Sequence, residues 1–139
     1  HRLIRRQRQM CIRDSNKQSQ NGLIPAVIVD AETKAFLMLG YMNKESYSLT
    51  KSTGQTWFWS RERQELWHKG ETSGNIQQVV SMTLDCDLDT LLIHVNPAGP
   101  ACHTNAYSCF FNTIKGEGLA DANQATIANK WTDGYFPKE

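Results

Sequence analysis

Aspartates and cysteines crowd one stretch of the second half of the chain and are the residues best suited to chemistry. The aspartates occupy alternate positions, at Asp85, Asp87 and Asp89, and the cysteines are Cys86, Cys102 and Cys109. Carboxylates are the preferred ligands of hard cations such as Mg²⁺, whereas thiolates bind softer ions such as Zn²⁺. The two ligand types together point to metal sites and to hydrolytic chemistry.

The three aspartates fit one site for a hard metal ion. Alternate residues of a strand or tight turn face the same way, and in a strand those two apart lie about 6.6 Å from each other. Carboxylates held so close raise each other's pKa unless a cation neutralises them. We therefore expect Mg²⁺ at Asp85, Asp87 and Asp89, with a solvated acidic turn as the alternative. In a strand, Cys86 would point to the opposite side and belong to a different site.

The three cysteines fit a catalytic zinc site. Their spacing matches no zinc ribbon or finger, and each alone could be a small buried apolar residue. Cys102 and Cys109, however, lie on a polar loop rich in Gly and Pro, beside His103. Three thiolates leave one position of a tetrahedral Zn²⁺ open for water, whose pKa then falls to about 7. Such a water is a nucleophile at neutral pH.

The reach of the chain indicates that two subunits share this zinc site. A strand from Thr90 to Val95 carries the chain roughly 20 Å away from Cys86, at about 3.3 Å per residue. The steps that remain to Cys102 span at most about 20 Å in return. We therefore expect Cys86 of one chain to meet Cys102 and Cys109 of another chain across a homodimer interface.

The elements that must position these residues are mostly strands. Apolar and alternating runs predict strands at residues 23–30, 35–42, 56–60, 76–84 and 90–95. Residues 23–42 form a predicted hairpin, and Asn43 is expected to cap a helix that runs to Thr53 and stops at Gly54. A second helix is expected at residues 121–130. The predicted fold is therefore a β-rich α+β domain.

Composition narrows the class of protein. The chain has 139 residues, which favours one domain, and its 15 basic and 14 acidic residues give no electrostatic footprint for nucleic acid or a membrane surface. It has no apolar run of about 18 residues and no secretory signal pattern, so we expect a cytoplasmic protein with a small-molecule substrate. In that reducing compartment, cysteines serve metal binding or catalysis more often than disulfides.

The ends of the chain differ from its centre. Residues 1–20 are rich in Arg and Gln without an amphipathic period, and we expect them to be non-native or disordered. Cys11 is excluded from the site on that ground. The predicted domain spans residues 21–112, and residues 113–139 are a C-terminal extension whose role the sequence does not indicate.

Three ordered motifs resemble those of phosphoribosyl-AMP cyclohydrolases of histidine biosynthesis. The motifs are Leu66–Asn75 (LWHKGETSGN), Asp85–Asp89 (DCDLD) and Gly99–Thr104 (GPACHT) followed by Ser108, Cys109 and Phe110. The resemblance runs from about Gly22 to Phe111. It implies a compact cyclohydrolase-type domain in an intertwined homodimer, with Zn²⁺ bound by Cys86, Cys102 and Cys109 across the two subunits. It also implies Mg²⁺ at Asp85, Asp87 and Asp89.

The resemblance also implies a reaction. The substrate would be 1-(5-phosphoribosyl)-AMP, whose adenine ring is opened by hydrolysis of the bond between N1 and C6. The product is the phosphoribosyl-formimino imidazole carboxamide ribotide. A nucleophile generated at zinc can attack C6 much as it does in adenine deamination, although a different bond breaks.

Residues near the motifs supply candidates for proton transfer and substrate binding. His103 could move protons, or could instead donate a hydrogen bond to a thiolate or the backbone. The candidates for binding the substrate and its two phosphates are Arg61, Arg63, Lys69, Gly70, Glu71, Thr72, Ser73 and Gly74. Asn105 stands where the family usually has Gly, and because Asn tolerates a left-handed backbone, we expect the turn to be kept.

Two other functions remain open. One is a zinc hydrolase that acts on another purine nucleotide. The other is a non-catalytic module in which zinc only staples the loop or the dimer, for instance with His103 as a fourth ligand.

Overall fold

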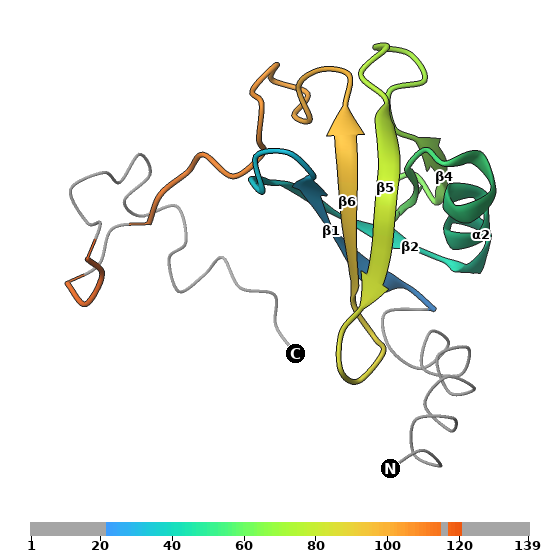
Figure 1. Cartoon of the computed structure of the whole chain (residues 1–139), viewed down its shortest axis with the longest axis horizontal. Helices are drawn as coiled ribbons and strands as arrows, with labels where there is room; N and C mark the ends of the chain where they lie inside the picture. Colours follow the sequence, from blue (N-terminus) through green and yellow to red (C-terminus); the bar gives the residue numbers. More distant parts are fainter. Residues whose placement is uncertain (1–21, 115–116, 121–139) are drawn as a thin grey trace. The chain divides into compact units, whose positions relative to one another are not determined.

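The computed structural model describes residues 22–114 and 117–120 (Figure 1). The chain divides into two units, residues 1–109 and residues 110–139. Every strand and the helix of the described residues belong to the first unit. The N-terminal segment 1–20, the expected helix 121–130 and most of the extension 113–139 lie outside the described residues.

A four-stranded sheet in the order β2-β1-β6-β5 forms the centre of the first unit. Its strands are β1 (Ile24–Asp30), β2 (Phe36–Met42), β5 (Gln77–Leu84) and β6 (Leu91–Pro97). β1 runs parallel to β6, and the pairs β1–β2 and β5–β6 are antiparallel. The predicted hairpin of residues 23–42 and the two later strands are therefore confirmed.

Helix α2 (Lys44–Thr53) begins and ends at the predicted residues. The Asn43 side chain accepts a hydrogen bond from the backbone of Ser46, and the Ser46 hydroxyl accepts one from Asn43, which completes a capping box. Gly54 closes the helix with a φ of 73°, in the left-handed region that glycine adopts without cost.

A second, two-stranded sheet joins β3 (Trp57–Ser60) to β4 (Glu65–His68). β3 contacts both β2 and α2. The sequence predicted β3 but not β4, a strand of four residues with no fully buried position and hence no clear alternation.

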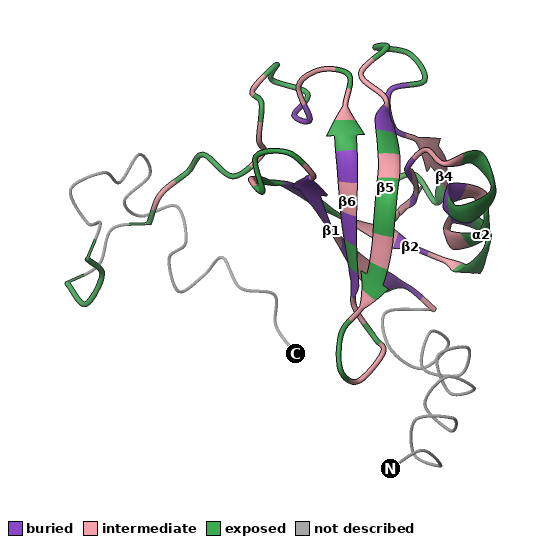
Figure 2. Cartoon of the chain, in the orientation of Figure 1, coloured by how far each residue is buried: buried purple, intermediate pink, exposed green. Residues whose placement is uncertain are grey.

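The core lies between the four-stranded sheet and the β3–β4 layer. Buried and more exposed residues alternate along β6 (Figure 2), so that Leu91, Ile93 and Val95 all point inward. The aromatic ring of Phe58 packs over Gly40, where a Cβ atom would lie 2.4 Å from the ring. The prediction of a strand-rich α+β domain is confirmed by six strands and one helix among the described residues. Within the same residues, no helix has the length and apolarity needed to cross a lipid bilayer.

Candidate active site

The two cysteines that follow β6 lie on a loop, residues 98–109, which we call the cysteine loop. Two backbone hydrogen bonds of 3.2 Å, from Ala101 to Tyr107 and from Cys102 to Ala106, fold it back on itself. Asn105 sits in the turn with a φ of 71°, and its N–H donates to the carbonyl of Cys102. The expectation that Asn105 adopts the left-handed backbone of the usual glycine is confirmed.

The thiols of Cys102 and Cys109 are hydrogen-bonded neighbours with different acidities. Cys102 is buried, but hydrogen bonds from the side chain and backbone of Thr104 and from Cys109 lower the pKa of its thiol. Burial and the hydrogen bond to Cys102 raise the pKa of Cys109 to about 11. Two adjacent thiols on one loop are a suitable pair of soft ligands for Zn²⁺, whose charge favours the ionised form of both.

Cys86 lies apart from this pair. It is exposed in the turn between β5 and β6, at the end of β6 opposite to the cysteine loop (Figure 1). Among the described residues, the only close group of three or more potential metal ligands is made by the aspartates. One chain therefore brings together two of the three predicted zinc ligands and leaves Cys86 apart, as the limited reach of the chain predicts. The sharing of the site between subunits stays a prediction.

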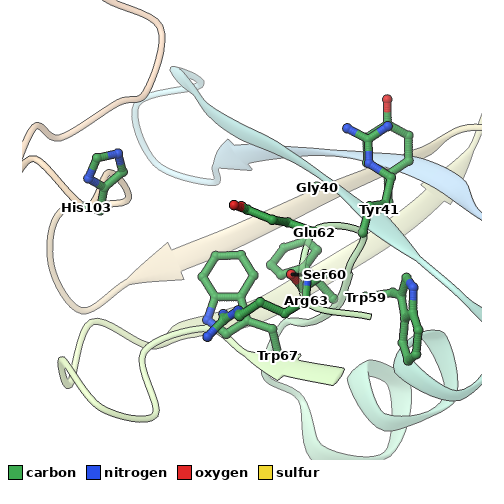
Figure 3. Close-up of a pocket in the computed structure, with 10 residues that line it drawn as sticks. Gly40, Tyr41, Trp59, Ser60, Glu62, Arg63, Trp67 and His103 are labelled. Atoms are coloured by element: carbon green, nitrogen blue, oxygen red, sulfur yellow. Dashed lines mark hydrogen bonds between the residues drawn. The ribbon is translucent and has the colours of Figure 1, made fainter. Parts of the chain in front are cut away.

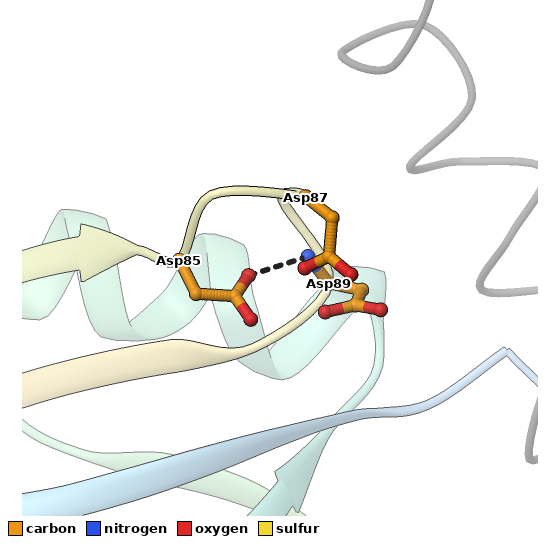
Figure 4. A group of neighbouring side chains, drawn as sticks. All are labelled: Asp85, Asp87 and Asp89. Atoms are coloured by element: carbon orange, nitrogen blue, oxygen red, sulfur yellow. Dashed lines mark hydrogen bonds between the residues drawn. The ribbon is translucent and has the colours of Figure 1, made fainter.

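The aspartates come together in the β5–β6 turn. Leu88 adopts a φ of 64°. The Asp85 carboxylate accepts a hydrogen bond of 3.1 Å from the backbone of Asp89 (Figure 4) and one of 3.2 Å from the backbone of Thr90. Ligand oxygens of Asp85, Asp87 and Asp89 lie within 4.8 Å of one another. A tight turn, and not the alternation of a strand, thus places the three carboxylates on one side.

The three carboxylates affect one another's ionisation. Hydrogen bonding to Asp89, burial and the negative charges of its neighbours raise the pKa of Asp87. Burial also raises the pKa of Asp85, but the hydrogen bonds it accepts from Asp89, Asp87 and Thr90 outweigh burial, and its pKa is lowered. A divalent cation would relieve this repulsion, and the hard oxygen donors fit Mg²⁺.

A cavity of about 500 Å³ unites the cysteine loop with the loop after β4. Both thiols and His103 line it. Among the residues predicted to bind substrate, those that line this cavity are Arg63, Lys69, Gly70, Glu71, Thr72 and Ser73. Gly74 and Arg61 are not among its lining residues. The structure thus gathers residues from distant motifs around one cavity.

A second cavity, of about 780 Å³, has Tyr41, Trp59 and Trp67 in its lining (Figure 3). Arg61 also lines it. The two cavities share Arg63, Trp67 and His103. The Arg61 guanidinium stacks on the Tyr41 ring, 3.9 Å from its centroid. The aromatic lining of Tyr41, Trp59 and Trp67 was not predicted from the sequence, although the density of aromatic residues in β3 was a signal for it.

Lys69 is the buried cation of the first cavity. It is 6% exposed, and its Nζ atom lies 5.8 Å from the centroid of the Trp67 ring. Burial lowers the pKa of Lys69, whereas the negative charges of ionised Cys109 and Cys102 oppose that change. A positive charge at this place can stabilise thiolates or a phosphate group.

Comparisons with known proteins match the part of the chain that carries these features. The family model described as phosphoribosyl-AMP cyclohydrolase matches residues 38–111. The chain is similar to the phosphoribosyl-AMP cyclohydrolase of Lactiplantibacillus plantarum, with 65% identity over 95 residues that cover 68% of this chain and 88% of that protein. For the phosphoribosyl-AMP cyclohydrolase of Streptococcus sanguinis, the identity is 62% over 97 residues, which cover 70% and 85% of the two chains.

A longer relative shows the same likeness. The histidine biosynthesis bifunctional protein HisIE of Bacillus subtilis is 56% identical over 108 residues, which cover 78% of this chain and 52% of that protein. The residues matched by the family model include both cavities, the aspartate turn and the cysteine loop.

Proposed function

The chain belongs to the phosphoribosyl-AMP cyclohydrolase family, and from this premise we propose that it opens the adenine ring of 1-(5-phosphoribosyl)-AMP with the aid of Zn²⁺ and Mg²⁺. The reaction is a step of histidine biosynthesis. The observation that supports the proposal best is the cavity of about 500 Å³, in which two thiols, His103 and the loop after β4 meet.

Cys102 and Cys109, together with Cys86 of the partner subunit, would hold the zinc ion. When bound, Zn²⁺ lowers the pKa of a coordinated water, so that a nucleophile is available at neutral pH. Asp85, Asp87 and Asp89 would hold Mg²⁺. Because Cys86 lies between Asp85 and Asp87 in the sequence, a Cys86 that reaches the partner's cysteine loop brings this aspartate turn to the same active site.

The chain's own residues then bind and orient the substrate. Water attacks C6, the bond from C6 to N1 breaks, C6 becomes the carboxamide carbon, and N1 receives a proton. His103 lines both cavities, which supports a role in which it accepts the proton of the attacking water and delivers it to N1. Lys69 and the backbone of the following loop face one cavity, and Arg61 faces the other, so each can receive one phosphate group.

The outer face of the sheet supports the proposed homodimer. Leu39 and Leu92 are 44% and 36% exposed, and both are register partners of Val27, which places the three side by side. Phe36, which is 61% exposed, is the register partner of Val29, two residues further along β1. Apolar residues grouped in this way are typical of a protein interface.

The experiment is a spectrophotometric assay of the purified protein with 1-(5-phosphoribosyl)-AMP, combined with metal analysis. We expect turnover with Zn²⁺ and Mg²⁺ present, loss of turnover on chelation, and recovery when both ions are restored. Absence of turnover under these conditions would contradict the proposal, and turnover of another purine nucleotide would favour a different zinc hydrolase. If Cys102→Ala folds, dimerises and keeps normal turnover, the zinc has no catalytic role.

A further inference from the structure

Three hydrogen bonds fasten the end of the cysteine loop to the β1–β2 hairpin. The Tyr107 hydroxyl donates to Oδ2 of Asp30 at 2.5 Å. The Ser108 hydroxyl donates to the carbonyl of Phe36 at 2.6 Å, and the N–H of Cys109 donates to the carbonyl of Leu37 at 2.7 Å. The loop that carries the thiols is thus held by a hairpin distant in sequence.

Asp30 is a rigid acceptor for Tyr107. It ends β1, is 6% exposed, and its Oδ1 atom accepts hydrogen bonds from the backbone of Glu32 and Thr33, at 2.8 and 3.2 Å. The Thr33 hydroxyl lies 2.6 Å from the Tyr107 hydroxyl. Because its own turn fixes the carboxylate, Asp30 determines where the Tyr107 hydroxyl can lie. The hydrogen bond from Tyr107 lowers the pKa of Asp30, so the bond is charge-assisted at neutral pH.

The backbone of Tyr107 also holds the segment that contains Cys102, the first cysteine of the loop. Its carbonyl accepts the hydrogen bond from Ala101, the residue before Cys102, and the next residues lead directly to Cys109. A displacement of Tyr107 would therefore move both thiols relative to the cavity. Neither Tyr107 nor Asp30 lines the cavity that holds those thiols.

We propose that Asp30 and Tyr107 are positioning residues that hold the cysteine loop in the geometry in which Cys102 and Cys109 bind metal. The proposal rests on the proposed zinc-dependent function. Partners that orient metal ligands typically change metal affinity or activity by about 10–100-fold when they are mutated.

The test compares Tyr107→Phe with Tyr47→Phe in the full chain. Both variants remove one hydroxyl, but Tyr47 lies on helix α2 beside Lys51, away from the loop. For Tyr107→Phe we expect Zn²⁺ affinity, measured by competition with a chromophoric chelator, to fall about 10-fold or more. The thiolate charge-transfer and ligand-field bands of the Co²⁺-loaded protein should change as well. Tyr47→Phe should match the unaltered protein in both.

A second measurement follows the loop without any metal. Amide hydrogen exchange at Cys109 and Cys102 should be faster in metal-free Tyr107→Phe than in the unaltered protein, and Asp30→Asn should give the same pattern. Unchanged exchange at these amides would overturn the proposal, whether or not the protein binds zinc. Changed exchange with unaltered Zn²⁺ affinity and Co²⁺ spectra would also overturn it, because the clamp would then be structural only. If the unaltered protein binds neither ion, the proposed function fails separately.

Discussion

The hydroxyl of Thr104 donates a hydrogen bond of 3.0 Å to the Sγ atom of Cys102. Together with the backbone of the same turn, this bond stabilises the thiolate and lowers the pKa of Cys102 despite burial. Cys109, which receives no such bond from Thr104, has its pKa raised to about 11. The two thiols of one loop are therefore unequal before any metal binds.

Replacing Thr104 with valine should raise the pKa of Cys102 in the metal-free protein. Valine keeps the branched shape but cannot donate a hydrogen bond to sulfur, so the Cys102 thiolate loses the largest stabilising interaction. We expect alkylation of Cys102 by iodoacetamide, followed by mass spectrometry of its peptide, to slow at neutral pH and to need a higher pH. Thr104→Ser keeps the hydroxyl and is the control. Equal rates in the valine and serine variants would contradict the role of the hydrogen bond.

Gly70 should tolerate a side chain less well than Gly74 in the same loop. Both have positive φ, 86° and 82°, which costs an alanine about 1–2 kcal/mol. A Cβ atom at Gly70 would also lie 2.4 Å from the backbone of Asn75 and Ile76, whereas one at Gly74 meets nothing within 4 Å. We expect urea denaturation to show a loss of about 2–4 kcal/mol for Gly70→Ala and about 1–2 kcal/mol for Gly74→Ala. Equal losses would mean that the backbone contact at Gly70 is unimportant.

The contribution of Asp30 to stability should depend on pH. Its pKa is lowered in the folded chain, chiefly by the Tyr107 hydroxyl, and is about 3.9 in an unfolded chain. The charged form therefore stabilises the fold above about pH 4, and this stabilisation is lost as pH falls through the folded pKa. Asp30→Asn should lower the free energy of unfolding by about 1–2 kcal/mol at pH 7 and by progressively less below pH 4.

Urea denaturation at a series of pH values measures this difference. Glu32→Gln removes a neighbouring carboxylate from the same turn and is the control. A loss for Asp30→Asn that is constant from pH 7 to about pH 3 would show that the charge of Asp30 does not contribute.

Local patterns explain which features the sequence revealed. The β1–β2 hairpin, the Asn43 cap and the Gly54 stop depend on residues close in the chain, and the structure confirms them. The separation of Cys86 from Cys102 within one chain was predictable because it depends only on the length of β6. The aspartates were grouped correctly, although a turn places them together.

Long-range contacts explain what the sequence left hidden. Tyr107 and Asp30 are 77 positions apart, and no periodicity connects them. β4 is short and half-exposed, so its pairing with β3 is decided by the packing of β3 and not by its own pattern. The contact between the loop after β4 and the cysteine loop likewise depends on tertiary packing. Gly99 and Asn75 show how close the two loops are, because a Cβ atom at Gly99 would lie 2.2 Å from the Asn75 side chain.

Mixing two inactive variants should restore activity if subunits share the zinc site. Cys86→Ala and Cys102→Ala each remove one ligand, so each homodimer should lose turnover. In a mixed dimer, one site would combine both defects and the other would contain Cys86, Cys102 and Cys109 intact. Random mixing gives half mixed dimers, so we expect about one quarter of the unaltered activity.

The experiment requires dimers that contain one subunit of each variant. Co-expression of the two variants with different affinity tags forms such dimers, and sequential purification on both tags isolates them. The purified mixed dimer should then have about one half of the unaltered activity and bind one zinc ion with three thiolates. Cys102→Ala mixed with Cys109→Ala is the matched control, because both lesions lie on the same loop and every shared site in that dimer lacks one ligand. Recovery in the control, or none in the Cys86 mixture despite dimer formation, would contradict a zinc site completed by Cys86 of the partner subunit.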